Sequence, residues 1–169
     1  MLKLGIIGTG AISHHFIEAA HASGQYQLAA VYSRNLETAE QFARRYSNVQ
    51  LFDQLDAFLM SSFDVVYIAS PNSLHYSQAK TALLSDKHVI LEKPAVTKPE
   101  EWKDLVQTAQ DNQRFIFEAA RNYHEDAFAT IKSFLADKQV LGADFNYAKY
   151  SSKMPNLLAG DTPNVFSDR

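Results

Sequence analysis

Short apolar runs alternate with helix-like patterns along the first 120 residues of this chain. The runs occupy residues 2–8, 27–33, 49–51, 64–69, 88–91 and 114–118. Between them, apolar side chains recur three and four positions apart, as on one face of a helix. Residues 64–69 are apolar nearly throughout, which is typical of a strand buried on both faces. The pattern predicts βαβ units and an α/β fold with a doubly wound parallel sheet, in the strand order 3-2-1-4-5-6.

The helical segments carry recognisable faces and ends. Gly24 is placed to stop the first helix, and Asn35 and Asp53 are placed to cap the second and third. The stretch Thr97–Glu100 has the spacing of a capping box with a proline in the first turn. The first helix is expected to bury one face, which comprises Ile12, Phe16, Ala19 and Ala20.

The alternation of strand and helix patterns ends after residue 142. Residues 143–150 alternate with a period of two and place aromatic side chains on one side, which predicts an antiparallel-type strand. Residues 152–169 show no clear period. We interpret residues 1–120 as one domain, and residues 121–169 as a connecting helix and the first strand of a second α/β domain that the chain does not finish.

Composition excludes several classes of function. The chain has 169 residues, a net charge of −3 and no cysteine, so disulfides, zinc–thiolate sites and cysteine nucleophiles are excluded. We expect no nucleic acid or membrane partner because no basic patch or long apolar run is present. A cytoplasmic protein is the expectation. No metal site is assigned, because the histidines outside the motifs below are scattered: His14, His15, His21, His88 and His124.

A glycine-rich turn follows the first strand. In the stretch from Leu4 to Ser13, Gly8 permits a tight strand-to-helix turn, and Gly10 lets a pyrophosphate approach the backbone. The N–H groups at the helix start, around Thr9, Ala11 and Ile12, form an anion site. Ser13 replaces the third glycine of the usual pattern. A glycine turn of some other α/β protein is the alternative.

Ser33 and Arg34 stand where the second strand ends. Folds that bind NAD usually place a carboxylate here for the ribose 2′-hydroxyl, whereas a hydroxyl and a guanidinium suit a 2′-phosphate. This favours NADP over NAD. The alternative is a solvated loop arginine. Glu37 is the nearest carboxylate, and the dipole of the next helix accounts for it.

The fourth strand is followed by Ser70, Pro71 and Asn72, with His75 in the next helical turn. Asn72 offers a donor and an acceptor at the mouth of the crevice, although a helix cap would explain it equally. For His75 alone, a plain surface histidine is the slightly favoured interpretation.

Glu92, Lys93 and Pro94 follow the fifth strand. The fourth and fifth strands end beside the predicted crevice, so both loops should face the nicotinamide end of a dinucleotide. Oxidation of an alcohol by hydride transfer needs a group that accepts the hydroxyl proton. A lysine can do so where its surroundings favour the neutral amine. An exposed lysine in a proline turn is the alternative.

Taken together and in this order, these motifs resemble the Gfo/Idh/MocA family, the relatives of glucose–fructose oxidoreductase and inositol dehydrogenase. The resemblance is strongest from Leu4 to Pro94, and Phe117–Ala119 also fits. It implies a Rossmann domain that binds NADP, with Pro71, Asn72 and Glu92 lining the cofactor. It also implies that Lys93 lies by the nicotinamide and substrate, as the catalytic residue.

The same resemblance implies an oxidoreductase acting on a sugar, a polyol or a related hydroxyl compound. Members of the family continue into a second domain that supplies much of the substrate pocket and commonly an oligomer interface. We therefore expect a homo-oligomer in the full-length form and little turnover by this chain alone. A non-catalytic dinucleotide sensor is the alternative, and retention of Lys93 speaks against it. A methyltransferase-like nucleoside binder fits less well, because such folds usually want a carboxylate where Ser33 and Arg34 stand.

Overall fold

The computed structural model of the protein describes residues 1–146, 148, 155, 158 and 159. By its internal contacts the chain divides between Ala119 and Ala120 into two compact units.

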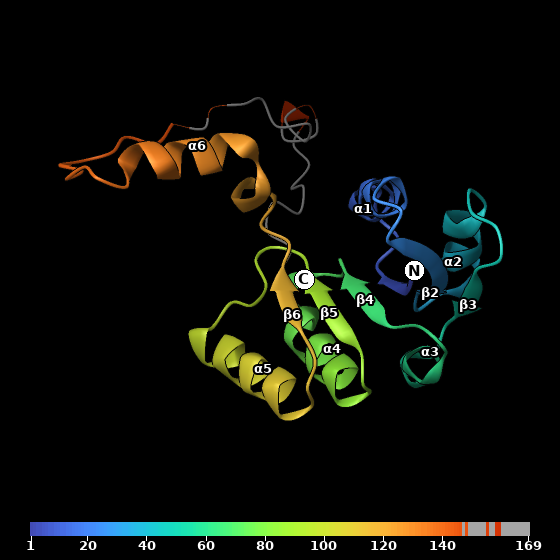
Figure 1. Ribbon diagram of the computed structural model, residues 1–169. Coiled ribbons are helices and arrows are strands. Elements are labelled where there is room, and N and C mark those ends of the chain that lie inside the picture. Colours follow the sequence, from blue (N-terminus) through green and yellow to red (C-terminus); the bar gives the residue numbers. More distant parts are fainter. Residues whose placement is uncertain (147, 149–154, 156–157, 160–169) are drawn as a thin grey trace. The chain divides into compact units, whose positions relative to one another are not determined.

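The first unit is built on a six-stranded sheet in the order β3-β2-β1-β4-β5-β6 (Figure 1). Each neighbouring pair of strands is parallel. The predicted fold class and strand order are therefore confirmed. The strands are β1 (Leu2–Ile7), β2 (Tyr26–Tyr32), β3 (Gln50–Phe52), β4 (Val65–Ile68), β5 (His88–Leu91) and β6 (Ile116–Glu118).

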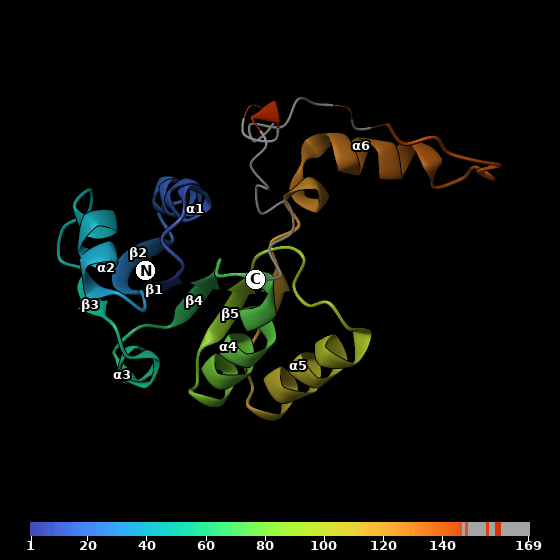
Figure 2. The same cartoon turned by 180° about the vertical axis from the view of Figure 1, so that it is seen from behind.

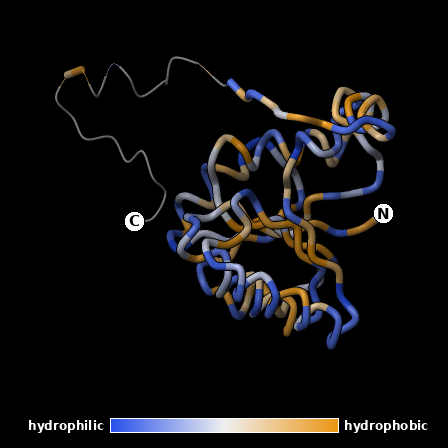
Figure 3. The backbone as a smooth tube through the Cα atoms, turned by 90° about the vertical axis from the view of Figure 1, so that its left-hand side faces the viewer, coloured by the Kyte–Doolittle hydropathy of each residue, from blue (hydrophilic) through white to orange (hydrophobic). Residues whose placement is uncertain are grey.

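Helices cover the sheet on both faces, which is why β4 is buried along its whole length. Side chains of β4 alternate between two cores: Val65 and Tyr67 pack with α1 and α2, and Val66 and Ile68 pack with α3, α4 and α5. Figure 2 shows α4 and α5 side by side, and hydrophobic colour gathers along the strands in Figure 3. The helices are α1 (Ala11–Ala22), α2 (Leu36–Ala43), α3 (Leu55–Met60), α4 (Asn72–Leu84) and α5 (Pro99–Asp111).

The buried face of α1 differs from the expected one. Ser13, Ile17 and Ala20 are the buried residues of this helix, whereas Ile12 is 46% exposed. The buried face therefore begins one residue later than expected, at Ser13 instead of Ile12. The Ser13 side chain points inward because its hydroxyl donates to the Gly8 carbonyl oxygen in the strand-to-helix turn. The stop at Gly24 is confirmed, since Gly24 has φ +67° just after the last turn.

Two of the three expected caps are wrong. The Asn35 side chain does accept hydrogen bonds from the N–H groups of Glu37 and Thr38. The N-cap of α3 is Gln54 instead of Asp53, and it makes no side-chain bond. The N-cap of α5 is Lys98, also without a side-chain bond, so the capping box at Thr97 does not form. Pro99 does occupy the first turn, and it needs no N–H partner there.

The second unit contains the short 3-10 helix η1 (Arg121–His124) and the helix α6 (Asp126–Leu135). None of the residues of α6 is buried. Residues 143–146 and 148 carry no strand assignment, while 147, 149 and 150 lie outside the described residues. The expected strand over 143–150 is thus not borne out at the residues that are described.

None of the helices in the described part of the chain combines the length and the hydropathy that a membrane span needs.

Candidate functional site

A cleft of about 200 Å³ opens where β1, β2 and β4 end. This is the point at which the strand order reverses, where open α/β sheets bind ligands. Six of the predicted binding residues line it: Gly8, Thr9, Ser33, Arg34, Ser70 and Pro71. The remaining lining residues are Ile7, Tyr32, Ala69, Leu74 and Gln78. The other predicted residues do not line it: Gly10, Ala11, Ile12, Asn72, His75, Glu92 and Lys93.

The two glycines of the β1–α1 turn differ in their surroundings. Gly8 has φ +101°, and a Cβ placed on it would lie 2.4 Å from the Ala69 carbonyl oxygen. Gly10 is the N-cap of α1 with φ −83°, and a Cβ there would meet no protein atom within 4 Å. The fold therefore needs a glycine at residue 8. At residue 10 it does not, and the absent side chain leaves open space in front of the backbone.

Ser13 closes the same turn from inside. Its side chain is fully buried, and its hydroxyl donates to the Gly8 carbonyl oxygen at 2.7 Å. No side chain caps the N-terminus of α1, since Gly10 has none. In the first helical turn the Ser13 N–H donates to the Gly10 carbonyl oxygen at 3.1 Å, so the N–H groups of Ala11 and Ile12, which precede it, are the ones that can face an anion in front of the turn.

The end of β2 presents a hydroxyl and a cation. The Ser33 N–H donates to the Phe52 carbonyl oxygen at 3.0 Å, which fixes the backbone at the edge of the cleft. Arg34 is exposed, and it takes part in no ion pair among the residues that the structure describes. Of the residues that line the cleft, Arg34 is the only charged one. The Asn35 side chain is engaged as the cap of α2.

The β4–α4 turn forms the opposite wall of the cleft. The Ser70 hydroxyl donates to Oε1 of Gln78, one of the few buried polar side chains, at 2.6 Å. Pro71 is the N-cap of α4, and Asn72 is its first residue. Asn72 is therefore not the helix cap, and the residue is half-buried.

His75 is not a surface residue. Its side chain is 1% exposed, because it packs under the loops that follow β4 and β5. Nδ1 lies 3.0 Å from the Pro94 carbonyl oxygen, and Nε2 lies 3.0 Å from the Ser70 carbonyl oxygen. The imidazole ring thus joins the two loops that the sequence assigned to the cofactor.

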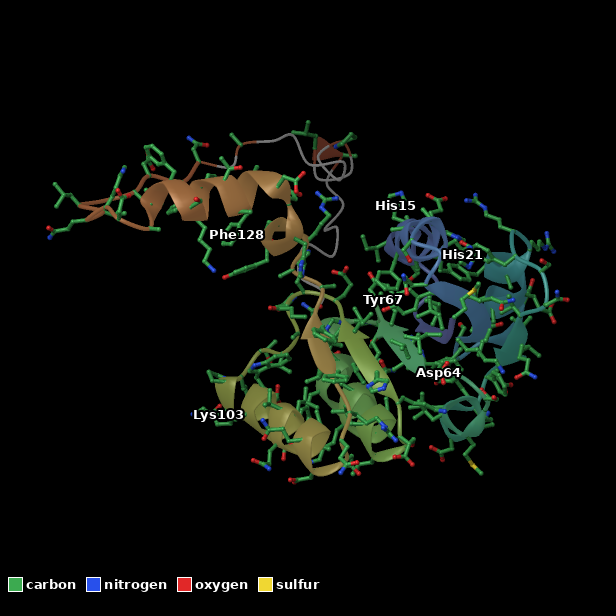
Figure 4. The ribbon with its side chains drawn as sticks, viewed as in Figure 1. His15, His21, Asp64, Tyr67, Lys103 and Phe128 are labelled. Atoms are coloured by element: carbon green, nitrogen blue, oxygen red, sulfur yellow. The ribbon has the colours of Figure 1, made fainter. Side chains whose placement is uncertain are left out.

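Glu92 and Lys93 begin the loop after β5. Lys93 is exposed. The Glu92 carboxylate accepts a hydrogen bond from the Tyr67 hydroxyl at 2.7 Å and one from the Lys93 N–H at 3.0 Å. Tyr67, labelled on β4 in Figure 4, was missed at the sequence level. Burial, followed by the hydrogen bond and the negative charge of Glu92, raises the pKa of the Tyr67 hydroxyl, so this group stays protonated and donates.

A second carboxylate holds the same loop from β6. Glu118 Oε1 accepts a hydrogen bond from the Ala95 N–H at 2.9 Å. Sequence reasoning had noted Glu118 only as part of a matching motif. Within the described ranges, no group of three or more histidine, aspartate or glutamate side chains is placed to hold a metal ion.

Comparisons with known proteins agree with the family resemblance found in the sequence. The sequence model of the Gfo/Idh/MocA oxidoreductase family, described as an NAD-binding Rossmann fold, matches residues 2–120. An uncharacterized oxidoreductase of Escherichia coli, YgjR, is 41% identical over 169 residues, which is 99% of this chain and 52% of that protein. The scyllo-inositol 2-dehydrogenase (NADP(+)) IolU of Bacillus subtilis is 34% identical over 168 residues, 98% of this chain and 51% of that protein.

Among solved structures, the 3-ketoreductase KijD10 from Actinomadura kijaniata, in complex with NADP and TDP-benzene, superposes with a TM-score of 0.75. It is 25% identical, over 80% of this chain and 42% of that one. The chain spans about half the length of the curated relatives named above. The match over residues 2–120, the identity to these relatives and the shared fold show that the chain belongs to the Gfo/Idh/MocA family of oxidoreductases, with its NAD-binding Rossmann fold.

Proposed function

We propose that the cleft binds NADP(H), and that the chain is the cofactor-binding part of an oxidoreductase that acts on a sugar, a polyol or a related hydroxyl compound. The observation that carries this proposal is the charge of the cleft lining, which contains Arg34 and no carboxylate. A carboxylate at the end of β2 would bind a ribose 2′-hydroxyl and repel a 2′-phosphate. A guanidinium beside the Ser33 hydroxyl binds a phosphate instead.

The β1–α1 turn fits the pyrophosphate of such a cofactor. Gly10 offers open space where a side chain would stand, and the uncapped first turn of α1 offers N–H donors. Thr9 lines the cleft between the two glycines. The positive end of the helix dipole adds to the attraction for an anion.

The relatives point in the same direction. IolU is named for NADP(+) and for an inositol, and KijD10 is described in complex with NADP. A D-glucoside 3-dehydrogenase of Escherichia coli is 33% identical over 115 residues. One of these proteins is a dehydrogenase of an inositol, one is a dehydrogenase of a glucoside and one is a 3-ketoreductase, which supports a sugar or polyol as the substrate class here.

Lys93 is the residue to which we assign the proton transfer. When bound, NADP⁺ supplies the acceptor for the hydride that leaves the substrate carbon. Nζ of Lys93 is the group to which we assign acceptance of the hydroxyl proton as the alcohol becomes a carbonyl. The Lys93 side chain is exposed and available to a ligand, and its backbone N–H is held by Glu92.

A parallel titration with NADPH and NADH, followed by nicotinamide fluorescence, tests the cofactor. We expect NADPH to bind more tightly, and Arg34→Ala to weaken NADPH about 10- to 100-fold, because a charge-assisted hydrogen bond contributes about 1.5–3 kcal/mol. NADH affinity should stay within about twofold. Arg44→Ala removes the same charge at the C-cap of α2, outside the cleft lining, and is the matched control. Equal binding of both cofactors would refute the preference for NADP.

A separate experiment tests the reaction. This chain alone should turn over polyols and sugars poorly, because we expect a second domain to supply much of the substrate pocket. In a longer version that contains that domain, Lys93→Ala should abolish turnover while NADPH still binds. Unchanged function after Lys93→Ala would favour a dinucleotide sensor.

A further inference from the structure

The loop Glu92–Ala95 is held along its backbone by side chains from three different elements. His75 of α4 and Glu118 of β6 reach backbone groups of Pro94 and Ala95. Tyr67 of β4 reaches the side-chain carboxylate of Glu92, which in turn accepts the Lys93 N–H. Turns of this length are usually held by their own local hydrogen bonds. Contacts from three neighbouring elements instead fix where the loop stands on the sheet.

The contact from β4 runs through two side chains. The Tyr67 hydroxyl donates to one oxygen of the Glu92 carboxylate at 2.7 Å, and the other oxygen accepts the Lys93 N–H at 3.0 Å. Tyr67 is 1% exposed, and its ring stacks on Phe16 of α1 at 3.8 Å between ring centroids. The ring is therefore rigid, and its hydroxyl is a fixed point for the carboxylate.

The contact from α4 is His75. Its two ring nitrogens face the carbonyl oxygens of Pro94 and Ser70 at 3.0 Å each. Ser70 lines the cleft, whereas Pro94 follows Lys93 directly. One buried imidazole thus lies between a wall of the cleft and the lysine loop, and a neutral ring, which has one N–H, donates to one of these two carbonyl oxygens.

The contact from β6 is Glu118, whose carboxylate accepts the Ala95 N–H at 2.9 Å. Ala95 is 5% exposed, so its N–H needs a partner inside the protein. Lys93, between these anchored groups, keeps an exposed side chain. The loop backbone is thus anchored on both sides of Lys93, whose amine takes part in no ion pair with the residues that the structure describes.

We infer that Tyr67, His75 and Glu118 are positioning residues that fix the Lys93 loop in place before any ligand arrives. The inference deepens the proposed function, because it rests on the assignment of proton transfer to Lys93. A catalytic group held in advance loses less freedom when the substrate binds, and a displacement of about 1 Å can cost a catalyst roughly 100-fold in rate. His75 also makes the position of Lys93 depend on the backbone of the cleft wall at Ser70.

Amide hydrogen exchange of this chain without cofactor tests the inference, read at the Lys93 and Ala95 amides by NMR. Tyr67→Phe keeps the ring but removes the hydroxyl, and it should speed exchange at Lys93 at least tenfold. Tyr76→Phe removes a hydroxyl that donates to Asp104 at 2.9 Å, away from this loop, and is the matched control. It should leave both amides unchanged. Thermal unfolding of each variant, measured in parallel, separates a local effect from a general loss of stability.

Glu118 offers a rescue test. Glu118→Ala should speed exchange at Ala95 at least tenfold, whereas Glu118→Gln keeps a carbonyl oxygen and should restore most of the protection. A merely structural role would raise exchange across β5 and β6 instead of at this amide. Wild-type exchange at Lys93 in Tyr67→Phe and at Ala95 in Glu118→Ala would overturn the inference.

The two proposals fail separately. Protection of these amides is measured without NADPH, so it tests the positioning alone. If NADPH fails to bind while the variants loosen the loop, the cofactor proposal is wrong and the positioning of the loop stands. If NADPH binds as expected and the amides do not respond, the positioning role is wrong.

Discussion

Alanine at Gly8 and alanine at Gly10 should have opposite consequences. At Gly8 the backbone has φ +101°, and a Cβ would lie 2.4 Å from the Ala69 carbonyl oxygen and 2.6 Å from its carbon. A left-handed backbone costs alanine roughly 1–2 kcal/mol, and overlap with a fixed backbone adds roughly 1–3 kcal/mol. Gly8→Ala should therefore lower Tm by roughly 4–20 °C, at about 2–4 °C per kcal/mol for a chain of this size.

At Gly10 the fold tolerates the same change. Its φ of −83° and ψ of 173° suit alanine, and the new methyl group meets no protein atom within 4 Å. Alanine is a poorer N-cap than glycine, but it restricts the unfolded chain, and the two effects together should stay within about 1 kcal/mol. The methyl group would stand where we place the pyrophosphate. NADPH should therefore bind at least about tenfold more weakly, which corresponds to about 1.4 kcal/mol.

Circular dichroism during thermal unfolding and NADPH fluorescence, applied to both variants, separate the two effects. The expected pattern is a low Tm for Gly8→Ala, and a near-normal Tm with weak NADPH binding for Gly10→Ala. A Gly8→Ala variant that melts with the wild type would refute the strain at this turn. A Gly10→Ala variant that binds NADPH as the wild type does would show that no phosphate group approaches this backbone.

Three further predictions concern stability and association. Ser13→Ala removes the buried hydrogen bond to the Gly8 carbonyl and should lower the free energy of unfolding by about 1 kcal/mol in urea titrations, with the m-value unchanged; an unchanged midpoint would contradict this. Burial, and in each case a nearby arginine, lowers the pKa of His14 and of His88 below the ordinary 6.5. The unfolded chain then binds more protons near that pH, so the free energy of unfolding should fall as pH drops through about 6.5, and a double histidine-to-glutamine variant should flatten this dependence. The exposed apolar side chains of α6 should make the chain associate as its concentration rises, and light scattering that reports a monomer throughout would refute this.

The sequence predicted the sheet well because each strand carries its own signal. A doubly wound sheet buries its central strands on both faces, so the apolar runs stand out without knowledge of their neighbours. Residues 88–91 were predicted to the residue, and the strand order was expected from the usual order of a doubly wound sheet of this βαβ pattern. The helix faces and caps were less predictable. Ser13 lies on the buried face of α1 because its hydroxyl donates a hydrogen bond to the Gly8 carbonyl oxygen in the preceding turn. Helical periodicity could not predict this, since it counts a serine as a polar residue that belongs on the exposed face.

The sequence predicted those site residues whose positions are set by the ends of the strands. Gly8, Ser33, Arg34 and Ser70 follow three different strands, and the strand order alone brings them to one cleft. The interpretation of His75, taken alone, as a surface residue was wrong for the opposite reason. Its burial depends on two loops that fold over it, and its partners are backbone carbonyls, which have no identity in a sequence.

The role of Tyr67 could be predicted in part, because the sequence indicates it once the strand order is known. It is the one polar side chain between Val65 and Ile68, in a strand that is otherwise aliphatic and fully buried. A buried tyrosine hydroxyl needs a partner. Since Ile68 pairs with Leu91 on the neighbouring strand, Glu92 follows one residue beyond that pair and is the nearest acceptor that the sequence offers. A polar side chain in an apolar central strand, combined with the register of its neighbour, therefore indicates which loop it supports, and here that loop carries Lys93.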